Sequence, residues 1–295
     1  MKSHSMLQSV LAVAMTWLSI GNASAAAKSV PQLFIASDST ASEYKPNPKN
    51  QQGWGAVLQP YFDSDKLTVV DLARGGRSSR TFVTEGHWDR LIEQVHPGDF
   101  VIIQFGHNDA GAVNAEPPGS TRPLRARGSI PGIGDDSQEI DNVLTGKHET
   151  VYSYGWYLRK MISETRAKQA TPILITLTKT NSWNEGRIPC KADSYRLWTW
   201  QTSEREKVAF VDLTRIAGDR YQRLGPEAVK GLFIDDATHS NLPGAQANAR
   251  DVVSGLLTLK GMPFRKALTK EGRKIAADPG PPGDSVCEPL PSAAR

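Results

Sequence analysis

Five short apolar runs constrain the fold of this chain more than any other feature of its sequence. Each run is continuous rather than alternating and is rich in Val, Ile, Leu and Phe. Strands of a parallel sheet have this pattern, because helices cover both of their faces. The sequence therefore predicts a central, mostly parallel five-stranded sheet. The runs are residues 33–36, 67–72, 100–105, 172–178 and 208–213.

Segments with helical spacing separate these runs. Apolar residues recur at helical intervals over residues 54–61 and 151–162, and a last helix is predicted over 243–259. Alternating strands and helices predict a three-layer α/β/α fold. Residues 110–147 lack such a pattern and contain many Gly, Pro, Arg and Asp residues. A long loop is predicted there, of the kind that often has a function.

The first 25 residues have the pattern of a secretory signal peptide. An apolar stretch over residues 6–20 precedes the small residues Ala23, Ser24 and Ala25. The apolar stretch is shorter than the ~20 residues that a membrane-spanning helix needs. We therefore expect a secreted or periplasmic protein. The predicted division is 1–25 signal peptide, 26–277 α/β domain and 278–295 proline-rich tail.

The charge balance and the cysteines limit the partners and the compartment. The formal net charge is only +4, and the charges are spread along the chain. This predicts neither a nucleic-acid partner nor a membrane partner after signal removal, and it does not determine the oligomeric state. Cys190 and Cys287 are the only two cysteines of the sequence. Because an oxidising compartment favours disulfides, we predict that they are bridged.

Four polar clusters follow the predicted strands or precede the last helix. They are residues 37–40, 74–80, 106–109 and 235–239. Each alone fits an ordinary structural role, such as a helix cap or a tight turn. In an open α/β sheet, however, ligands bind beyond the carboxyl ends of the strands. We therefore expect the clusters to lie close together.

Together the clusters contain the groups that acyl transfer needs. Ser39 can act as nucleophile, His239 as general base and Asp236 as the group that orients the imidazole. The backbone N–H groups of Ser39 and Gly76 and the side-chain amide of Asn108 can form an oxyanion hole. A metal site built on Asp236 and His239 with the neighbouring Asp235 is an alternative, but it leaves the nucleophile and the oxyanion donors without a role.

Substrate contacts are less specific in the sequence. His107 is expected to line the site or to be a structural histidine. Trp183 and Trp198 can each stack on a sugar ring or belong to the core. Several arginines can bind uronic-acid carboxylates or be solvated loop charges. They are Arg77, Arg80, Arg122, Arg125 and Arg127.

The four clusters resemble, in order and spacing, the sequence blocks of the SGNH (GDSL-type) hydrolase superfamily. Within it, Asp38-Ser39-Thr40, residues 75–80 and residues 105–109 are most similar to rhamnogalacturonan acetylesterases, carbohydrate esterase family twelve. The likeness extends from Leu33 to Leu257. It implies a flavodoxin-like α/β/α fold, a Ser-His-Asp triad and no metal or organic cofactor.

The chain departs from this pattern at one position. The usual first block begins Gly-Asp-Ser, whereas this chain has Ser37 before Asp38 and Ser39. A serine fits there if its φ is negative. The literal Gly-Asp-Ser of residues 283–285 lies in the tail, after the histidine block, and follows no predicted strand. We therefore interpret it as unrelated to the site.

These observations predict a secreted serine esterase that removes O-acetyl groups from a plant cell-wall polysaccharide, most of all rhamnogalacturonan or pectin. An acetylated polysaccharide or oligosaccharide would be its substrate partner. Few bulky apolar residues follow Ser39 or Asn108, which predicts a small acyl pocket. Two alternatives stay open: a lipase or thioesterase of the same superfamily acting on longer acyl esters, and a catalytically silent carbohydrate-binding protein.

Overall fold

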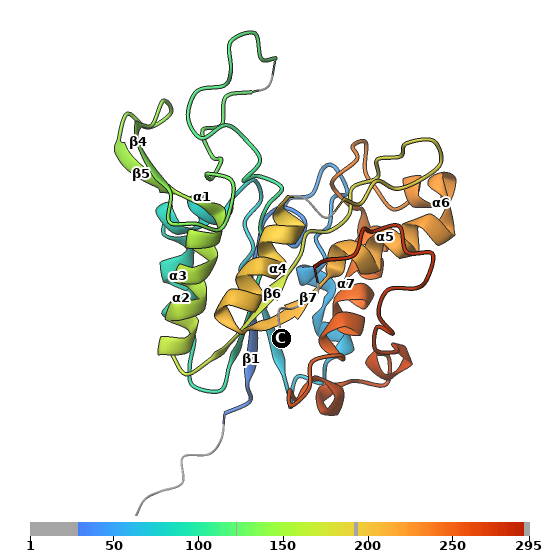
Figure 1. The fold of residues 1–295 in the computed structure, drawn as a ribbon. Coiled ribbons are helices and arrows are strands. Elements are labelled where there is room, and N and C mark those ends of the chain that lie inside the picture. Colours follow the sequence, from blue (N-terminus) through green and yellow to red (C-terminus); the bar gives the residue numbers. More distant parts are fainter. Residues whose placement is uncertain (1–28, 122, 192–193, 292–295) are drawn as a thin grey trace, which may run out of the picture.

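The computed structural model describes residues 29–121, 123–191 and 194–291, and the predicted signal peptide lies outside them. A five-stranded sheet forms the centre of the molecule (Figure 1). Its strands are β1 (Gln32–Ala36), β2 (Thr68–Asp71), β3 (Phe100–Ile103), β6 (Thr171–Ile175) and β7 (Ala209–Val211).

The sheet has the strand order β2-β1-β3-β6-β7, and every neighbouring pair is parallel. This is the flavodoxin-like order, in which the connections reverse direction between β1 and β3. All five predicted strands are confirmed, although β1 begins one residue before its apolar run and the other four strands are shorter than theirs. The sheet is wholly parallel, where a mostly parallel one was predicted.

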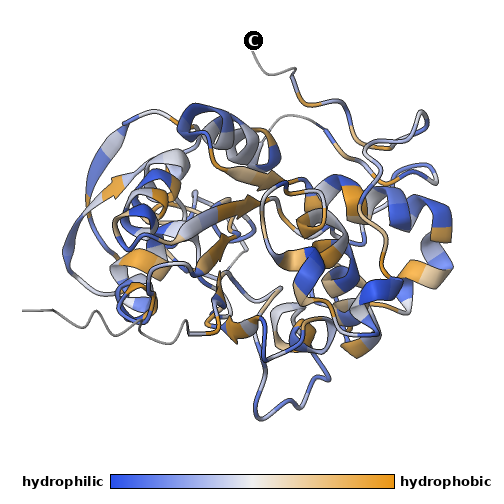
Figure 2. Cartoon of the chain, turned by 90° about the horizontal axis from the view of Figure 1, so that it is seen from below, coloured by the Kyte–Doolittle hydropathy of each residue, from blue (hydrophilic) through white to orange (hydrophobic). Residues whose placement is uncertain are grey.

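Both faces of the sheet are buried, which explains the continuous apolar runs. In β1, Leu33 and Ile35 point into one core cluster, whereas Phe34 and Ala36 point into the other. Figure 2 shows the apolar strands enclosed between helices that present their own apolar faces inward. Burial on both sides stabilises each strand without any alternation of polar residues.

Helices cover the two faces in separate groups. One face is covered by α1 (Ser79–Thr84), α2 (His87–Ile92), α3 (Tyr154–Ala167) and α4 (Tyr195–Glu206). The other face is covered by α5 (Leu213–Leu224) and α7 (Leu242–Leu256), and the short α6 (Pro226–Lys230) follows α5. Side-chain caps begin several of these helices, since their first N–H groups have no partner within the helix. The capping residues are Ser78 of α1, Ser153 of α3, Asp212 of α5 and Asn241 of α7.

Residues 54–61 are not one α-helix, as their spacing predicted. They form two 3₁₀ helices, Gly55–Val57 and Gln59–Tyr61. Pro60 would lie inside an α-helix over these residues, where its missing N–H removes a hydrogen bond. The apolar spacing is satisfied all the same, because Trp54 and Leu58 are fully buried in the core.

The predicted long loop over residues 110–147 contains a strand that the sequence analysis missed. β4 (Ser137–Asp141) pairs antiparallel with β5 (His148–Tyr152) in a separate hairpin. Four of the five β4 residues are exposed, so the hairpin has no apolar pattern. Val151 belongs to β5 and not to the following helix, which begins after the cap at Ser153.

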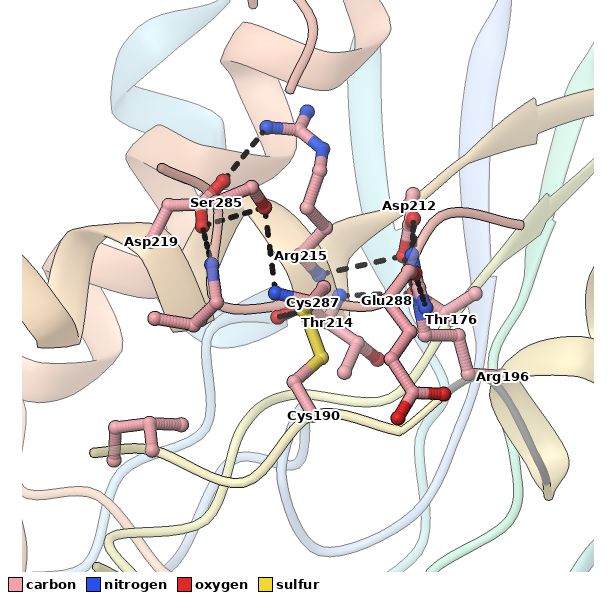
Figure 3. Close-up of a disulfide and its surroundings, with 12 residues drawn as sticks. Thr176, Cys190, Arg196, Asp212, Thr214, Arg215, Asp219, Ser285, Cys287 and Glu288 are labelled. Carbon is pink, nitrogen blue, oxygen red and sulfur yellow. Dashed lines mark hydrogen bonds and ion pairs between the residues drawn. A yellow bond between two sulfur atoms is a disulfide. The ribbon is translucent and has the colours of Figure 1, made fainter. Parts of the chain in front are cut away.

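The described part of the tail packs against the domain (Figure 3). The predicted disulfide between Cys190 and Cys287 is confirmed. Beside it, the Arg196 guanidinium donates a hydrogen bond of 2.8 Å to the carbonyl of Glu288 and pairs with Asp212 at 2.7 Å. The tail is thereby held against the start of α4 and the end of β7.

No helix within residues 29–121, 123–191 and 194–291 is both long and apolar enough to cross a membrane.

Candidate active site

The four polar clusters meet at the carboxyl edge of the sheet. Ser39, Gly76 and Asn108 lie just after β1, β2 and β3, and His239 lies just before α7. All four line one cavity of about 800 Å³. Ser39 and Asn108 flank the point between β1 and β3 where the chain connections reverse direction, which is where open α/β sheets form a crevice.

Ser39, His239 and Asp236 form a continuous hydrogen-bonded chain. His239 Nε2 lies 2.9 Å from Ser39 Oγ, and His239 Nδ1 lies 2.7 Å from Asp236 Oδ2. The other carboxylate oxygen of Asp236 accepts hydrogen bonds of 2.7 Å from the backbone N–H groups of Thr238 and His239. These bonds close a tight turn that places the imidazole over Ser39.

The ionisation of Asp236 determines which atom donates and which accepts in each of these hydrogen bonds. Partial burial raises the pKa of its carboxyl, but the hydrogen bonds from the His239 side chain and from the backbone N–H groups outweigh burial and hold the pKa below its usual value. An ionised carboxylate only accepts hydrogen bonds, so the Nδ1 atom of His239 carries the proton. The lone pair of Nε2 then faces the Ser39 hydroxyl.

The turn after β1 holds Ser39 in place. The buried Asp38 carboxylate accepts hydrogen bonds from the N–H of Thr40 at 2.9 Å and from its hydroxyl at 2.8 Å. The Tyr44 hydroxyl donates to the carbonyl of Ser39 at 2.8 Å. Burial raises the pKa of the Tyr44 phenol, so it stays a donor at neutral pH. Ser39 itself is only 8% exposed.

Ser37, which replaces the usual glycine of the first block, is accommodated without strain. Its φ is not positive, and its hydroxyl donates a 3.0 Å hydrogen bond to Gln104 Oε1. The same oxygen accepts the indole N–H of Trp54, and the Gln104 amide donates to Thr176 across the sheet. The substitution therefore adds a buried hydrogen bond under the nucleophile.

Three consecutive carbonyls after β2 are each held by a side-chain donor. Gly75 O accepts from Arg77 Nη1 at 2.9 Å, Gly76 O from Arg127 Nη1 at 2.9 Å, and Arg77 O from Asn108 Nδ2 at 2.8 Å. The Gly75 carbonyl and the Gly76 N–H belong to one planar peptide group, so holding the carbonyl also fixes the direction of the N–H. Gly76 has φ +80°, which favours glycine.

Arg77 does not line the cavity. Its guanidinium is engaged by Glu85 at 2.8 Å as well as by the Gly75 carbonyl. The structure thus places this predicted substrate contact outside the cavity wall, where it holds the loop after β2. His107, by contrast, lines the cavity, and its Nε2 lies 3.1 Å from Thr178 Oγ1. Burial lowers the pKa of His107, which favours a neutral imidazole.

The carboxylate of Asp109 holds the turn of residues 106–109 in place. It accepts hydrogen bonds from the N–H of Ser79 at 3.1 Å and from the hydroxyl of Ser129 at 2.9 Å, and the Ser79 hydroxyl also contacts it. Burial raises its pKa to about 6, although these hydrogen bonds counteract part of the shift. Asp109 joins the turn after β3 to the start of α1 and to the 110–147 segment.

The other residues predicted to contact the substrate lie in different parts of the structure. Arg80 is fully buried and its guanidinium is paired with Glu149 at 2.7 Å. Its role is therefore structural, and the prediction that it can contact the substrate is wrong. Trp198 packs in the core, whereas Trp183 lines a second, neighbouring pocket. Arg122 lies outside the described residues. Arg125 and Arg127 line the cavity.

The sequence analysis missed several residues of the cavity wall. Tyr44, Gln51 and Glu116 line it, and none belongs to a strand-end cluster. They lie on irregular segments with no periodic pattern, so only the tertiary structure brings them to Ser39. Within the described residues, no three His, Cys, Asp or Glu side chains gather as metal ligands, and Asp236 is occupied by His239.

Curated relatives match most of the chain. A rhamnogalacturonan acetylesterase from Emericella nidulans is 27% identical over 81% of this chain and 89% of its own length. Two Bacillus subtilis proteins are similar: the probable rhamnogalacturonan acetylesterase YesY at 29% identity (81% of this chain, 98% of the relative) and the rhamnogalacturonan acetylesterase RhgT at 28% (82% and 97%).

Solved structures share the fold. The Bacillus subtilis protein YxiM matches with a TM-score of 0.61 and 26% identity over 79% of this chain, which spans 58% of that chain. A variant of Axe2, an acetyl-xylooligosaccharide esterase from Geobacillus stearothermophilus, matches with a TM-score of 0.50 and 19% identity over 77% of this chain and 94% of its own. The model of the GDSL-like lipase/acylhydrolase family matches residues 38–247, which include all of the four polar clusters except Ser37. The chain therefore belongs to the GDSL-like lipase/acylhydrolase family, whose members hydrolyse carboxylic esters.

Proposed function

We propose that this protein is a secreted serine esterase that removes O-acetyl groups from a plant cell-wall polysaccharide, with rhamnogalacturonan as the first candidate. The observation that carries the proposal is the hydrogen-bonded chain from Asp236 through His239 to Ser39, which faces Gly76 and Asn108 across one polar cavity. The names of the curated relatives support the acetyl group and the polysaccharide.

The reaction follows from these positions. Ser39 Oγ attacks the acetyl carbonyl while its proton moves to His239 Nε2, and Asp236 stabilises the resulting imidazolium. The N–H groups of Ser39 and Gly76 and the Asn108 amide donate to the oxyanion. The sugar hydroxyl leaves with the proton of His239, and acetyl-Ser39 remains. Water, deprotonated by His239, then attacks the acetyl carbonyl, and the bond to Ser39 Oγ breaks as His239 returns the proton to Oγ and acetate leaves.

The cavity wall favours a small acyl group on a polar alcohol. Ala110 and Gly111 lie beside the oxyanion donors and offer little apolar surface for a long chain. Arg125, Arg127 and Glu116 line the remainder and can bind a hydroxylated, charged polymer. Each methylene buried in an apolar groove would contribute about 0.8 kcal/mol, so a lipase would need a more apolar wall than this one.

Secretion and domain division complete the proposal. Residues 1–25 are the signal peptide, 26–277 the esterase domain and 278–295 an appended tail. The disulfide between Cys190 and Cys287 supports an oxidising compartment.

Hydrolysis of p-nitrophenyl esters tests the acyl specificity. We expect kcat/KM to fall from acetyl through butyryl to octanoyl esters. A maximum at octanoyl would replace the acetylesterase with a lipase or thioesterase, and the absence of turnover would favour a silent binding protein.

Acetate release from a panel of acetylated polymers tests the alcohol specificity. We expect rhamnogalacturonan to exceed homogalacturonan and xylan. Faster release from xylan would keep the esterase but exclude the pectic substrate. The matched control is Ser39→Ala, which leaves the cavity wall intact and removes only the nucleophile.

A further inference from the structure

The Asp236–His239 pair connects a second pocket to the cavity of Ser39. Its volume is about 610 Å³, and Asp236 lines it, whereas His239 lines the cavity of Ser39. The two side chains are 2.7 Å apart, so only the imidazole ring and two hydrogen bonds separate this pocket from Ser39 Oγ. The Asp236 side chain is 46% exposed. When the acetyl group of a polymer lies at Ser39, a neighbouring sugar can therefore extend toward this pocket.

Trp183 gives the pocket an aromatic wall of defined orientation. Its indole N–H donates a 2.8 Å hydrogen bond to Asn181 Oδ1, and the Asn181 N–H donates at 2.8 Å to the carbonyl of Ala237, on the Asp236 turn. The indole also packs against Phe233 and its apolar neighbours, and remains half-buried. Because the N–H already has a partner, the ring offers its apolar surface, on which the C–H groups of a sugar can pack.

Three exposed charged side chains line the same pocket as the indole. Glu227, Lys230 and Asp235 line the pocket, are exposed, and make no side-chain hydrogen bond or ion pair to any other described residue. Carboxylates and an ammonium at the rim of an aromatic wall can bind sugar hydroxyls as acceptors and donors.

The charge of this pocket is opposite to that of the first cavity. Three carboxylates, from Glu227, Asp235 and Asp236, face the single ammonium of Lys230. In the first cavity, two guanidinium groups face one carboxylate. A uronic acid would meet unfavourable charge in the second pocket, whereas a neutral sugar would not.

We propose that this pocket is a subsite for a neutral sugar ring of the polysaccharide, packed on Trp183, next to the sugar that carries the acetyl group. The inference rests on the proposed esterase function. A sugar in this subsite covers the exposed carboxylate of Asp236 and excludes water from its hydrogen bond to His239, which strengthens that bond. Substrates that fill the subsite are therefore hydrolysed faster than small esters.

Calorimetric binding of deacetylated oligosaccharides to Ser39→Ala protein tests the subsite without requiring turnover. Rhamnogalacturonan oligosaccharides, in which neutral and acidic sugars alternate, are expected to bind more tightly than homogalacturonan oligosaccharides of equal length. Adding Trp183→Ala should weaken binding of the first ligand about tenfold, equivalent to about 1.4 kcal/mol, because the sugar loses the aromatic surface on which it packs. Trp183→Tyr should restore most of it. Equal affinities with and without the indole would overturn the proposal.

A charge reversal at the rim tests the sugar type and does not disturb the apolar packing. Glu227→Arg should improve the binding of homogalacturonan oligosaccharides relative to rhamnogalacturonan oligosaccharides. Glu204→Arg, the same change at an exposed position of α4, is the matched control and should alter neither. An identical response of both variants would contradict the subsite.

Turnover of p-nitrophenyl acetate separates this inference from the proposed function. Trp183→Ala should raise KM for acetylated oligosaccharides by a larger factor than it changes kcat/KM on this small ester, because the ester does not reach the second pocket. Wild-type protein without any turnover would refute the esterase. Turnover with an unchanged oligosaccharide KM in Trp183→Ala would refute only the subsite.

Discussion

The Asp-Ser dipeptides that end in Ser39 and Ser285 lie in two different regions of this protein, and of these two serines Ser39 is the one with an imidazole nitrogen opposite its hydroxyl. Ser39 lies at the end of β1, with His239 Nε2 at 2.9 Å and a cavity in front of it. Ser285 lies in the tail, in the literal Gly-Asp-Ser, and its hydroxyl donates to Asp219 Oδ1 at 2.9 Å. The sequence motif is therefore a poorer guide to function than its position relative to the sheet.

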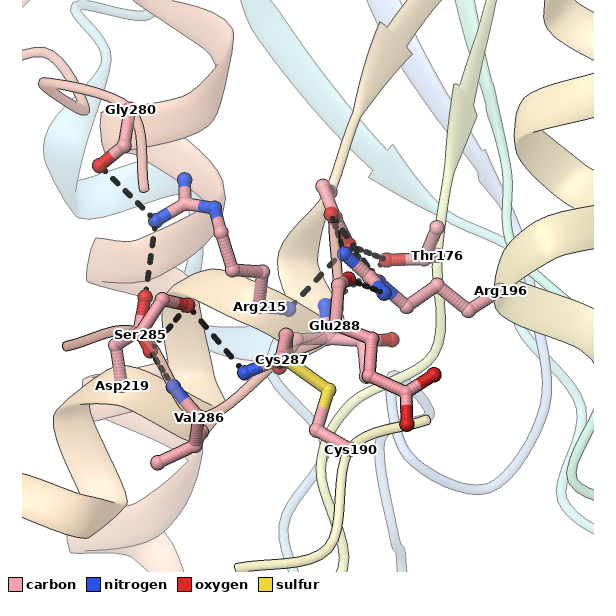
Figure 4. A network of polar contacts seen from close by, with 12 residues as sticks. Thr176, Cys190, Arg196, Arg215, Asp219, Gly280, Ser285, Val286, Cys287 and Glu288 are labelled. Atoms are coloured by element: carbon pink, nitrogen blue, oxygen red, sulfur yellow. Dashed lines mark hydrogen bonds and ion pairs between the residues drawn. A yellow bond between two sulfur atoms is a disulfide. The ribbon is translucent and has the colours of Figure 1, made fainter. Parts of the chain in front are cut away.

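The second region holds the tail in place (Figure 4). Asp219 on α5 accepts the Ser285 hydroxyl and the Val286 N–H, both at 2.9 Å, and pairs with Arg215 at 3.2 Å. Arg215 also contacts Asp278. The polar atoms of this network bind one another and the tail, whereas the Ser39 hydroxyl and the His239 imidazole meet at the wall of a cavity. The comparison thus separates a region that holds the tail against the domain from one in which a serine hydroxyl, an imidazole and a carboxylate are aligned at a cavity.

Replacing the nucleophile should have the largest effect. Ser39→Ala should lower kcat on p-nitrophenyl acetate by about 10⁴-fold or more, because triad members act as a unit. The melting temperature should stay within a few degrees of wild type, as the hydroxyl is not part of the core. Substantial turnover by this variant would break the comparison and assign the reaction to another group.

The next largest effect is expected from removing an oxyanion donor. Asn108→Ala should lower kcat by about 10²–10³-fold with little change in KM, since the amide acts on the charge that develops in the transition state. It also frees the carbonyl of Arg77, so Asn108→Asp, which is isosteric but cannot donate, serves as a second variant. A rise in KM at constant kcat would instead indicate a substrate contact.

Breaking the disulfide should affect stability and not chemistry. Cys287→Ser, combined with Cys190→Ser to avoid a free thiol, should lower the free energy of unfolding by about 2–5 kcal/mol. Denaturant unfolding measures this change. Hydrolysis of p-nitrophenyl acetate per folded molecule should be unaltered, and a large loss of kcat would show that the two regions are coupled.

The buried carboxyl of Asp109 should make stability depend on pH. Its pKa is about 6 in the folded protein against 3.8 as the reference. The folded state therefore binds more protons than the unfolded state between these values, so its contribution to stability is lost as pH rises from about 4 to about 6, and amounts to about 3 kcal/mol. Denaturant unfolding across this range gives the free energy of unfolding of the wild type minus that of Asp109→Asn. This difference should increase toward pH 4. A constant difference would contradict the raised pKa.

The smallest effect is expected for the second serine. Ser285→Ala should leave esterase activity unchanged and lower the free energy of unfolding by about 1 kcal/mol, the usual net contribution of one hydrogen bond. Thermal unfolding and p-nitrophenyl acetate turnover measure both quantities. Lost activity in this variant would reverse the roles of the two regions.

Sequence pattern alone determined the layers of this protein and the meeting of its four polar blocks. Continuous apolar runs require burial on both faces, and parallel strands bring the segments after Leu33–Ala36 and its neighbours to one edge. Family resemblance then assigned Ser39, Gly76, Asn108 and His239 to one site. The pairing of the cysteines followed from there being only two.

Only the tertiary structure decided which polar groups lie behind and beside that site. Arg77 holds the Gly75 carbonyl, and Tyr44 holds the carbonyl of Ser39, because separate loops converge above the sheet. The β4–β5 hairpin has no apolar alternation, since most of β4 faces solvent. Trp183 lines its own pocket because Asn181 is bonded to the Asp236 turn. Such contacts join residues distant in sequence through hydrogen bonds, which produce no periodic pattern in the sequence. The burial of a strand or helix face does produce one.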